Sequence, residues 1–289
     1  MLHQTPKEPT PSGAAPRLRK WLANGYERLS LVWHGWRHGR GRTSARRLDS
    51  GLMLLDDGSK KIHVPQLRAS LAFRDGIDVR LEAVASKYLG GTAYVPRQGN
   101  LVIDIGAGIG EFTVWCAGNG ASVIAFEPDP LAFTCLERNT AAFADVQIYP
   151  YALWKERTKL RLHCSADTTE SSLIEDGRSN GRGADVEAWP LDGLEFLVRL
   201  AMIDLIKIDG EGVEPEIILA ASRTLRRTRI VAVDVGASDR RPNLRTRVEA
   251  ALSAQNFRIV DHGRSETILA LNAAMVGPLN NRVLGRRGS

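Results

Sequence analysis

The stretch LVIDIGAGIGEF at residues 101–112 decides the fold of this chain. Three apolar residues lead into Asp104, and glycines follow at positions 106, 108 and 110. An apolar run that ends in closely spaced glycines is typical of a strand that turns sharply into a helix, because glycine adopts the positive backbone angles that such turns need. The question that follows is which ligand this turn holds.

Beyond the turn, the sequence alternates between short apolar runs and longer amphipathic segments. This alternation predicts an α/β fold with a doubly wound, mostly parallel sheet and helices on both faces. The last two apolar runs follow one another across a short turn, so they predict an antiparallel edge strand on a seven-stranded sheet. We predict strands at residues 101–105, 122–127, 146–150, 203–208, 229–235, 257–260 and 267–271, and helices at 110–118, 130–142, 214–227 and 242–254.

The sequence before residue 99 predicts a smaller N-terminal unit. LMLLDDGSKKIHV, residues 52–64, predicts a hairpin that turns at Asp57 and Gly58, and a helix is expected over 75–89. The glycines of RHGRGRTSARR, residues 37–47, predict a linker. We divide the chain into a disordered lead with a basic amphipathic arm (1–47), an N-terminal hairpin and helix (48–98), a main domain (99–275) and a basic tail (276–289).

Composition narrows the class of protein. The chain has 289 residues, of which 43% are apolar and 25% are charged, and these are ordinary values for a globular protein. No apolar run approaches the roughly 18 residues of a membrane span. The first residues lack the apolar core of a signal peptide, so we expect a cytoplasmic protein. The three cysteines, Cys116, Cys135 and Cys164, are widely spaced, which argues against a disulfide framework or a zinc site.

The basic charge is concentrated in the arm. Residues 17–47 hold nine Lys or Arg and one acid, so the rest of the chain is slightly acidic although the total charge is +6. This distribution argues against a nucleic-acid partner for the main domain. Apolar residues of the arm recur at helical spacing among arginines, which is also typical of peripheral membrane contact through residues 17–37. We favour docking of this stripe on the main domain over membrane binding; the sequence does not predict an oligomeric state.

The spacing of the glycines discriminates between ligands. A dinucleotide fingerprint needs G-x-G-x-x-G, but Glu111 stands at its third glycine position, and the Gly-Lys-Ser/Thr of a phosphate-binding loop is absent. The next strand ends in Glu127, 21 residues after Gly106, where a carboxylate accepts hydrogen bonds from both hydroxyls of an adenosine ribose. S-adenosylmethionine fits this pattern, because its sulfonium and ammonium are cations that tolerate Asp104 and Glu127 as neighbours.

These motifs resemble those of the FkbM-type methyltransferases from about Leu101 to Asp234. The resemblance rests on DIGAGIGEFT (104–113), AFEPDP (125–130), RNTAAF (138–143), ALW (152–154), SSL (171–173) and above all DLIKIDGEGVEPEIILAA (204–221). The chain departs from the family pattern at Gly210, Ala220 and Asp234, where valine, glycine and glutamate are usual. The resemblance implies a class I, Rossmann-like fold and transfer of a methyl group from S-adenosylmethionine to a hydroxyl oxygen, often of a sugar or another secondary metabolite.

The candidate site residues follow from the turn, the second strand and this resemblance. The expected cofactor-binding residues are Asp104, Gly106, Ala107, Gly108, Gly110, Thr113, Glu127, Pro128, Asp129 and Ala152. Asp209 is the first candidate for the base that accepts the hydroxyl proton, Glu211 is the second and Glu214 the third. Two acids are a thin ligand set, so no metal is expected. SSL at 171–173 is expected to close over the cofactor or acceptor, or to be a solvated loop.

Several alternatives remain open from the sequence. Glu214 stands beside Pro215, as expected of a residue in the first turn of a helix, and acids after a strand often cap such helices. The isolated histidines His63, His163 and His262 are alternative bases. A nucleic-acid methyltransferase is a rival function, although DGEG stands where an Asn/Asp-Pro-Pro-aromatic turn would be expected. A rival function outside the enzymes is that of a non-catalytic binding module, held at a membrane by the basic arm.

Overall fold

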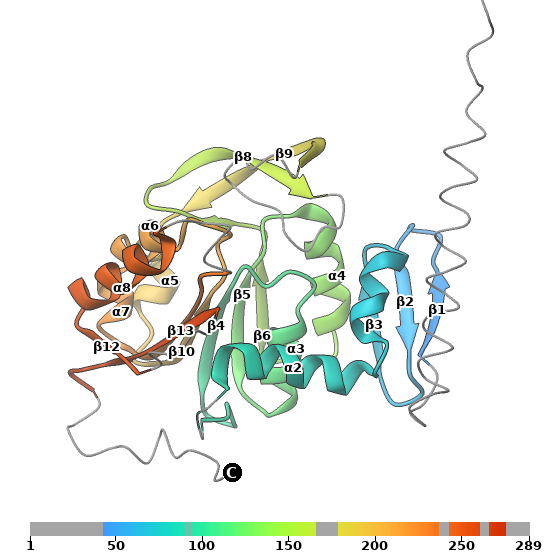
Figure 1. Cartoon of the computed structure of the whole chain (residues 1–289), viewed down its shortest axis with the longest axis horizontal. Helices are drawn as coiled ribbons and strands as arrows, with labels where there is room; N and C mark the ends of the chain where they lie inside the picture. Colours follow the sequence, from blue (N-terminus) through green and yellow to red (C-terminus); the bar gives the residue numbers. More distant parts are fainter. Residues whose placement is uncertain are drawn as a thin grey trace, which may run out of the picture.

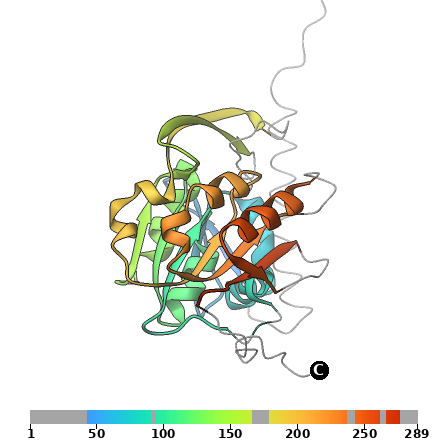
Figure 2. The same cartoon turned by 90° about the vertical axis from the view of Figure 1, so that its left-hand side faces the viewer.

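The computed structural model describes residues 43–90, 92, 94–165, 179–236, 243–260 and 266–275. Three layers of helix, sheet and helix form the main body, a small sheet packs beside it, and a hairpin rises above it (Figures 1 and 2). The expected features at 17–37, 171–173 and 276–289, and His262, lie outside the described residues and stay predictions.

A seven-stranded sheet is the centre of the fold and confirms the predicted α/β class. Its strand order is β12-β13-β11-β10-β4-β5-β6, and the five strands from β11 to β6 are parallel. The one antiparallel strand, β13, lies between β11 and the edge strand β12. The strands are β4 (Leu101–Ile105), β5 (Ser122–Phe126), β6 (Val146–Tyr149), β10 (Ile203–Ile208), β11 (Thr228–Asp234), β12 (Phe257–Ile259) and β13 (Thr267–Asn272).

Helices cover both faces of this sheet because the strand residues are apolar on both sides. Val102, Val123 and Leu205 pack under α2 and α3 on one face, whereas Ile103, Ile206 and Val231 pack against α6 to α8 on the other. The helices are α2 (Ile77–Leu89), α3 (Glu111–Gly118), α4 (Pro130–Thr140), α5 (Glu195–Val198), α6 (Glu214–Leu219), α7 (Ser222–Leu225) and α8 (Leu244–Ala254). A short 3-10 helix, η2 (Leu191–Gly193), precedes α5.

The single helix predicted over 214–227 is wrong, because the structure divides it into α6 and α7. The Asp192 carboxylate accepts hydrogen bonds from the backbone N–H groups of Arg223 (2.7 Å) and Thr224 (2.8 Å). These N–H groups lie in the first turn of α7 and have no acceptor within the helix, so Asp192 allows a new helix to begin there. Asp192 lies in η2, so this contact was not visible in the local sequence.

The N-terminal unit is a three-stranded antiparallel sheet followed by η1 (Leu67–Phe73) and α2. The predicted hairpin is confirmed as β2 (Met53–Asp56) and β3 (Lys61–Val64). The linker predicted over 37–47 is wrong for its last four residues, which form β1 (Ser44–Arg47) against β2. Polar side chains are tolerated there because β1 is an exposed edge strand. The domain boundaries at 47, 98 and 275 stay predictions.

A second small sheet, absent from the sequence predictions, rises above the carboxyl ends of the parallel strands (Figure 1). It contains β7 (Ala152–Leu153), β8 (Thr158–Ser165) and β9 (Ser179–Trp189) in the order β7-β9-β8. Leu160 and Leu162 alternate with charged residues on β8, and Leu162 packs against Ala152, Val186 and Ala188. That period-two alternation is the signal that could have predicted β8.

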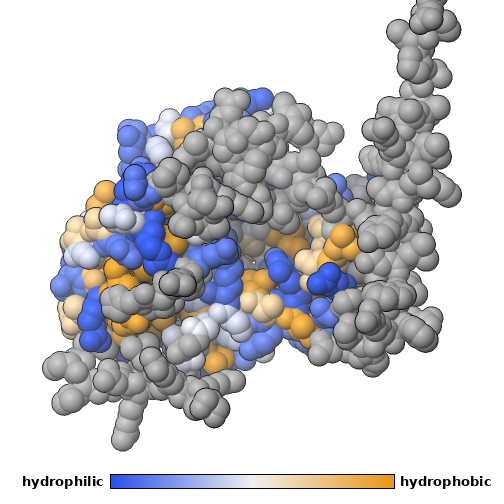
Figure 3. Space-filling view, viewed as in Figure 1, coloured by the Kyte–Doolittle hydropathy of each residue, from blue (hydrophilic) through white to orange (hydrophobic). Residues whose placement is uncertain are grey.

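No helix in the described part of the chain has the length and apolar character needed to span a bilayer. On the face drawn in Figure 3, hydrophobic and hydrophilic residues of the described part are mixed.

Asn139 of α4 joins the N-terminal unit to the main sheet layer. Its side chain accepts from the His63 N–H (2.7 Å) and donates to the His63 carbonyl (3.0 Å), so it pairs with β3 as a neighbouring strand would. The same amide donates to the Ile109 carbonyl in the glycine turn (2.8 Å). Ile109 and Cys135 also belong to the apolar core of the N-terminal unit, so the two parts share a core.

We therefore predict that Asn139→Ala lowers the free energy of unfolding by about 1–3 kcal/mol, because it leaves half-buried backbone groups of His63 and Ile109 unpaired. Urea denaturation measures this change. Asn119→Ala is the control, because the Asn119 amide makes a single bond at the exposed end of α3. Equal stabilities of the two variants would contradict the joining role of Asn139.

Candidate active site

The glycine turn after β4 brings the backbone close to the end of β10. Gly106, Gly108 and Gly110 have φ angles of 72°, 58° and 92°, all in the left-handed region that favours glycine. A Cβ atom on Gly106 would lie 2.0 Å from the Asp209 carbonyl oxygen, so no larger residue fits between β4 and β10. A Cβ atom on Gly108 would meet nothing within 4 Å, because this part of the turn faces open space.

Glu127 follows β5 and holds the turn from the other side. Its carboxylate accepts hydrogen bonds from the backbone N–H groups of Gly108 (2.6 Å) and Asp129 (2.8 Å). Burial raises the pKa of Glu127 to about 7, although these two bonds act in the opposite direction. Asp129 itself caps α4 by accepting from Leu131 N and Ala132 N.

Asp104 and Thr113 lie beneath the turn and are fully buried. The Thr113 hydroxyl donates to Asp104 Oδ2 (2.6 Å), and the Lys207 ammonium lies 3.1 Å from Asp104 Oδ1. The two residues therefore support the turn from below, and neither lines the pocket described next.

The sequence analysis did not predict a role for Lys207 of β10. Its ammonium donates to the carbonyls of Gly106 (2.6 Å) and Ile105 (3.3 Å) and lies 3.9 Å from Asp209 Oδ2. Burial lowers the pKa of Lys207, but the negative charges of Asp104 and Asp209 raise it by more, so the net effect is a raised pKa. The available signal was a lysine in the second half of a strand where the neighbouring residues, Ile206 and Ile208, are apolar.

The residues after β10 form the acidic side of the site. Asp209 Oδ2 accepts from the Tyr88 hydroxyl at 2.7 Å. Glu211 has a φ of 55°, which is strained for a residue other than glycine. Glu214 is buried, and its carboxylate accepts from the N–H groups of Gly210 and Gly212 at 3.0 Å each. Glu214 therefore shapes the loop between β10 and α6 and does not line the pocket.

These elements enclose a pocket of about 610 Å³, counting the space at its open mouth. It lies at the carboxyl ends of the parallel strands, where ligands bind in such sheets. The predicted residues that line it are Gly106, Gly108, Glu127, Pro128, Ala152, Asp209 and Glu211. The predicted residues that do not line it are Asp104, Ala107, Gly110, Thr113 and Asp129.

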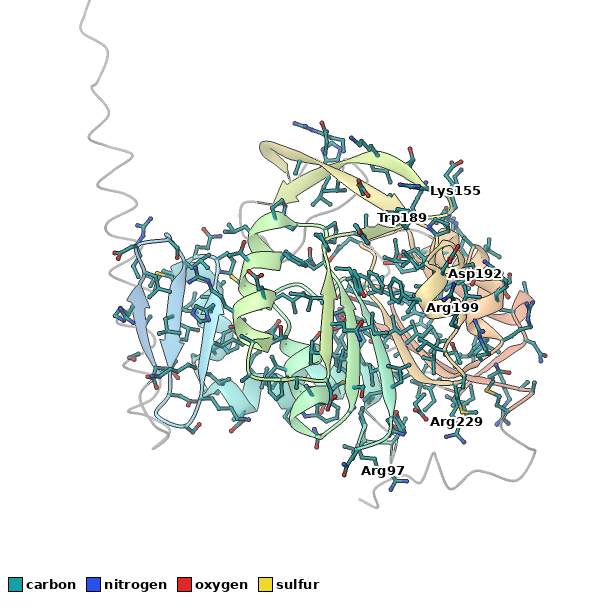
Figure 4. All side chains as sticks on the ribbon, turned by 180° about the vertical axis from the view of Figure 1, so that it is seen from behind. Arg97, Lys155, Trp189, Asp192, Arg199 and Arg229 are labelled. Carbon is teal, nitrogen blue, oxygen red and sulfur yellow. The ribbon has the colours of Figure 1, made fainter. Side chains whose placement is uncertain are left out.

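The pocket also has an apolar wall that the sequence did not predict. Tyr151 precedes β7 and Leu153 is its last residue, whereas Leu162 belongs to β8. Val213 precedes α6 and Ile217 lies within it. The Tyr151 ring is tilted by 41° against the ring of Trp189, with centroids 5.9 Å apart. Trp189 is the last residue of β9 and lies at the base of the β8–β9 hairpin (Figure 4).

The described histidines do not take part in this site. His63 bonds to Asn139, and neither His63 nor His163 lines the pocket. In the described residues, no three or more His, Cys, Asp or Glu side chains are grouped to hold a metal ion.

The pocket chemistry fits a cationic ligand. Three carboxylates line it, from Glu127, Asp209 and Glu211, whereas no Lys or Arg of the described residues does so. A dinucleotide pyrophosphate would face these acids without a compensating cation, but a sulfonium and an ammonium would be attracted to them. Glu127 lies beside the open side of Gly108, where its carboxylate can accept hydrogen bonds from ribose hydroxyls.

Comparison with protein families agrees with this geometry. The family model described as the methyltransferase FkbM domain matches residues 104–259, more than half of the chain. The chain belongs to the FkbM methyltransferase family. The resemblance of the sequence motifs is thus confirmed, and the cofactor of this domain is S-adenosylmethionine. A comparison with curated proteins found no match.

Several solved structures show a distant likeness to this chain. Magnesium protoporphyrin IX methyltransferase from Synechocystis PCC 6803, with bound SAM, is 14% identical with a TM-score of 0.38, over 68% of this chain and 78% of that one. The fibrillarin pre-rRNA processing protein of Methanococcus jannaschii is 10% identical with a TM-score of 0.41, over 79% and 97%. Likeness at this level does not bear on the acceptor of this FkbM domain.

The raised pKa of Glu127 predicts that cofactor affinity depends on pH. The ionised carboxylate accepts hydrogen bonds from the ribose hydroxyls better than the neutral acid does. Affinity for S-adenosylmethionine should therefore fall about tenfold from about pH 8 to about pH 6, across the pKa of about 7. Glu127→Gln should weaken binding by about 1–3 kcal/mol at the higher pH and remove its own share of the pH dependence. Calorimetric titrations measure both effects; an identical pH dependence in the variant would show that Glu127 is not responsible.

The glycine turn predicts opposite outcomes for two alanine variants. Gly106→Ala should destabilise the protein by more than the roughly 1–2 kcal/mol of a left-handed alanine, because its Cβ collides with the Asp209 carbonyl. Gly108→Ala should pay only that conformational cost and remain folded, but bind S-adenosylmethionine more weakly because the methyl group enters the cofactor side of the turn. Urea denaturation and calorimetry separate the two; equal stabilities would contradict the close approach at Gly106.

Proposed function

We propose that this FkbM domain methylates a hydroxyl oxygen of a sugar, a glycan or another secondary metabolite. The observation that carries the proposal is Asp209, an acid that lines the cofactor pocket. Its carboxylate accepts a hydrogen bond from the Tyr88 hydroxyl and lies 3.9 Å from the Lys207 ammonium. S-adenosylmethionine supplies an electrophilic methyl group on its sulfonium. The acceptor oxygen forms the new C–O bond as the S–C bond breaks, and Asp209 takes the hydroxyl proton.

The chemistry of the pocket wall supports an acceptor without phosphate groups. The acids Asp209 and Glu211 would repel an anion. Apolar side chains from β8 and α6 line the adjoining wall, which suits the carbon skeleton of a small molecule.

The experiment that tests this proposal is a product screen. The protein is incubated with S-adenosylmethionine and candidate sugars, glycans, lipids and short RNAs, and mass spectrometry seeks a gain of one methylene unit. Methylation on oxygen of an uncharged acceptor supports the proposal, whereas methylation of RNA alone would overturn it. S-adenosylmethionine binding with no product from any acceptor class would favour the non-catalytic module.

We predict that Asp209→Asn lowers kcat by about 10²–10⁴-fold, the usual contribution of a general base, with an unchanged affinity for the cofactor. Asparagine preserves the size of the side chain, so the pocket is retained while the proton acceptor is lost. Steady-state kinetics on the identified acceptor give kcat, and calorimetry gives the affinity. Unchanged kcat would reject Asp209 as the base and leave Glu211 as the next candidate.

A further inference from the structure

Two consecutive residues at the end of α2 reach two acids of the main sheet. Lys87 lies 2.6 Å from Asp234 at the end of β11, and the Tyr88 hydroxyl donates to Asp209 after β10 at 2.7 Å. Helix α2 ends at residue 89, before the matched family domain begins at residue 104. A segment outside the family domain therefore contacts the proposed base directly.

The surroundings of Tyr88 fix its hydroxyl in one place. The side chain is 4% exposed, and its ring packs edge-on against Phe112 with centroids 5.3 Å apart. The Lys207 ammonium lies 5.1 Å from the centroid of the same ring. Burial, followed by the charge of Asp209, raises the pKa of Tyr88 well above its usual value. The Tyr88 hydroxyl thus stays protonated and donates a hydrogen bond to the Asp209 carboxylate.

The Asp209 side chain would otherwise have rotational freedom at the pocket. Lys207 is 3.9 Å away, which is too far for a hydrogen bond, so its attraction alone does not set the direction of the carboxylate. The Tyr88 bond is 2.7 Å long, is partly buried and ends on Oδ2. Such a bond selects one orientation of the carboxylate, as a base needs when it receives a proton from an acceptor held in line.

We propose that Tyr88 is a positioning residue for Asp209, so that the N-terminal unit completes the active site of the FkbM domain. This inference rests on the proposed role of Asp209 as the base. Tyr88 does not line the pocket, and its hydroxyl acts only through the carboxylate. The N-terminal unit thus contributes to the rate of methyl transfer as well as to the stability of the fold.

The test is Tyr88→Phe, which keeps the buried ring and removes only the hydroxyl. Tyr94→Phe is a matched control, because the Tyr94 hydroxyl is also buried, and among the described residues it has no hydrogen-bond partner. Lys87→Gln is the second control, because it weakens the attachment of α2 at Asp234 without touching Asp209. Urea denaturation and calorimetry with S-adenosylmethionine establish that each variant is folded and binds the cofactor.

Two readouts then decide the proposal. Crystal structures of the cofactor-bound wild type and variants should show the Asp209 carboxylate turned or in several orientations in Tyr88→Phe alone. This readout needs no acceptor. On the acceptor from the product screen, Tyr88→Phe should lower kcat by about 10- to 100-fold with little change in KM, whereas both controls retain wild-type kcat.

Three outcomes would overturn the proposal. The first is an Asp209 carboxylate that keeps its wild-type orientation in Tyr88→Phe. The second is an equal loss of kcat in Lys87→Gln or Tyr94→Phe, which would indicate a general effect of packing. The third is a loss of kcat in Tyr88→Phe together with full activity of Asp209→Asn, which would show that Tyr88 acts by another route and that Asp209 is not the base.

Discussion

The buried ammonium of Lys207 is the interaction on which the site depends. It neutralises Asp104 at 3.1 Å, donates to the carbonyl of Gly106 at 2.6 Å and faces Asp209 at 3.9 Å. A charge in the interior is tolerated only with such partners, and the loss of one partner of a buried pair typically costs about 3–5 kcal/mol. Lys207 therefore joins the glycine turn to the acid below it and places a positive charge beside the acid at the pocket.

This arrangement explains why the turn suits S-adenosylmethionine and not a dinucleotide. The third glycine of a dinucleotide fingerprint is replaced by Glu111, which begins α3 and pairs with Arg80 at 2.5 Å. On the cofactor side of the turn, the Glu127 carboxylate accepts a hydrogen bond from the Gly108 N–H. The Gly106 and Ala107 N–H groups bond to the Phe126 carbonyl, so these N–H groups and that of Gly108 are already paired and not free to receive a pyrophosphate. The acids that line the pocket favour a cation.

Much of the fold could be predicted from the sequence because it depends on local patterns. The apolar runs of β4, β5 and β10 and the glycine spacing after β4 are visible within a dozen residues. The division of α6 from α7 was not visible, because Asp192 caps α7 from 31 residues away. The roles of Tyr88 and Lys207 also escaped prediction, since each acts on a partner about a hundred residues distant along the chain: Tyr88 is 121 residues from Asp209, and Lys207 is 101 residues from the Gly106 carbonyl.

The most direct test of the central claim, that the acid-flanked turn holds S-adenosylmethionine, is a calorimetric titration of the wild-type protein with S-adenosylmethionine and, separately, with NAD. The account predicts saturable binding of S-adenosylmethionine at one site per chain and no heat of binding with NAD. Binding of NAD with none of S-adenosylmethionine would contradict it.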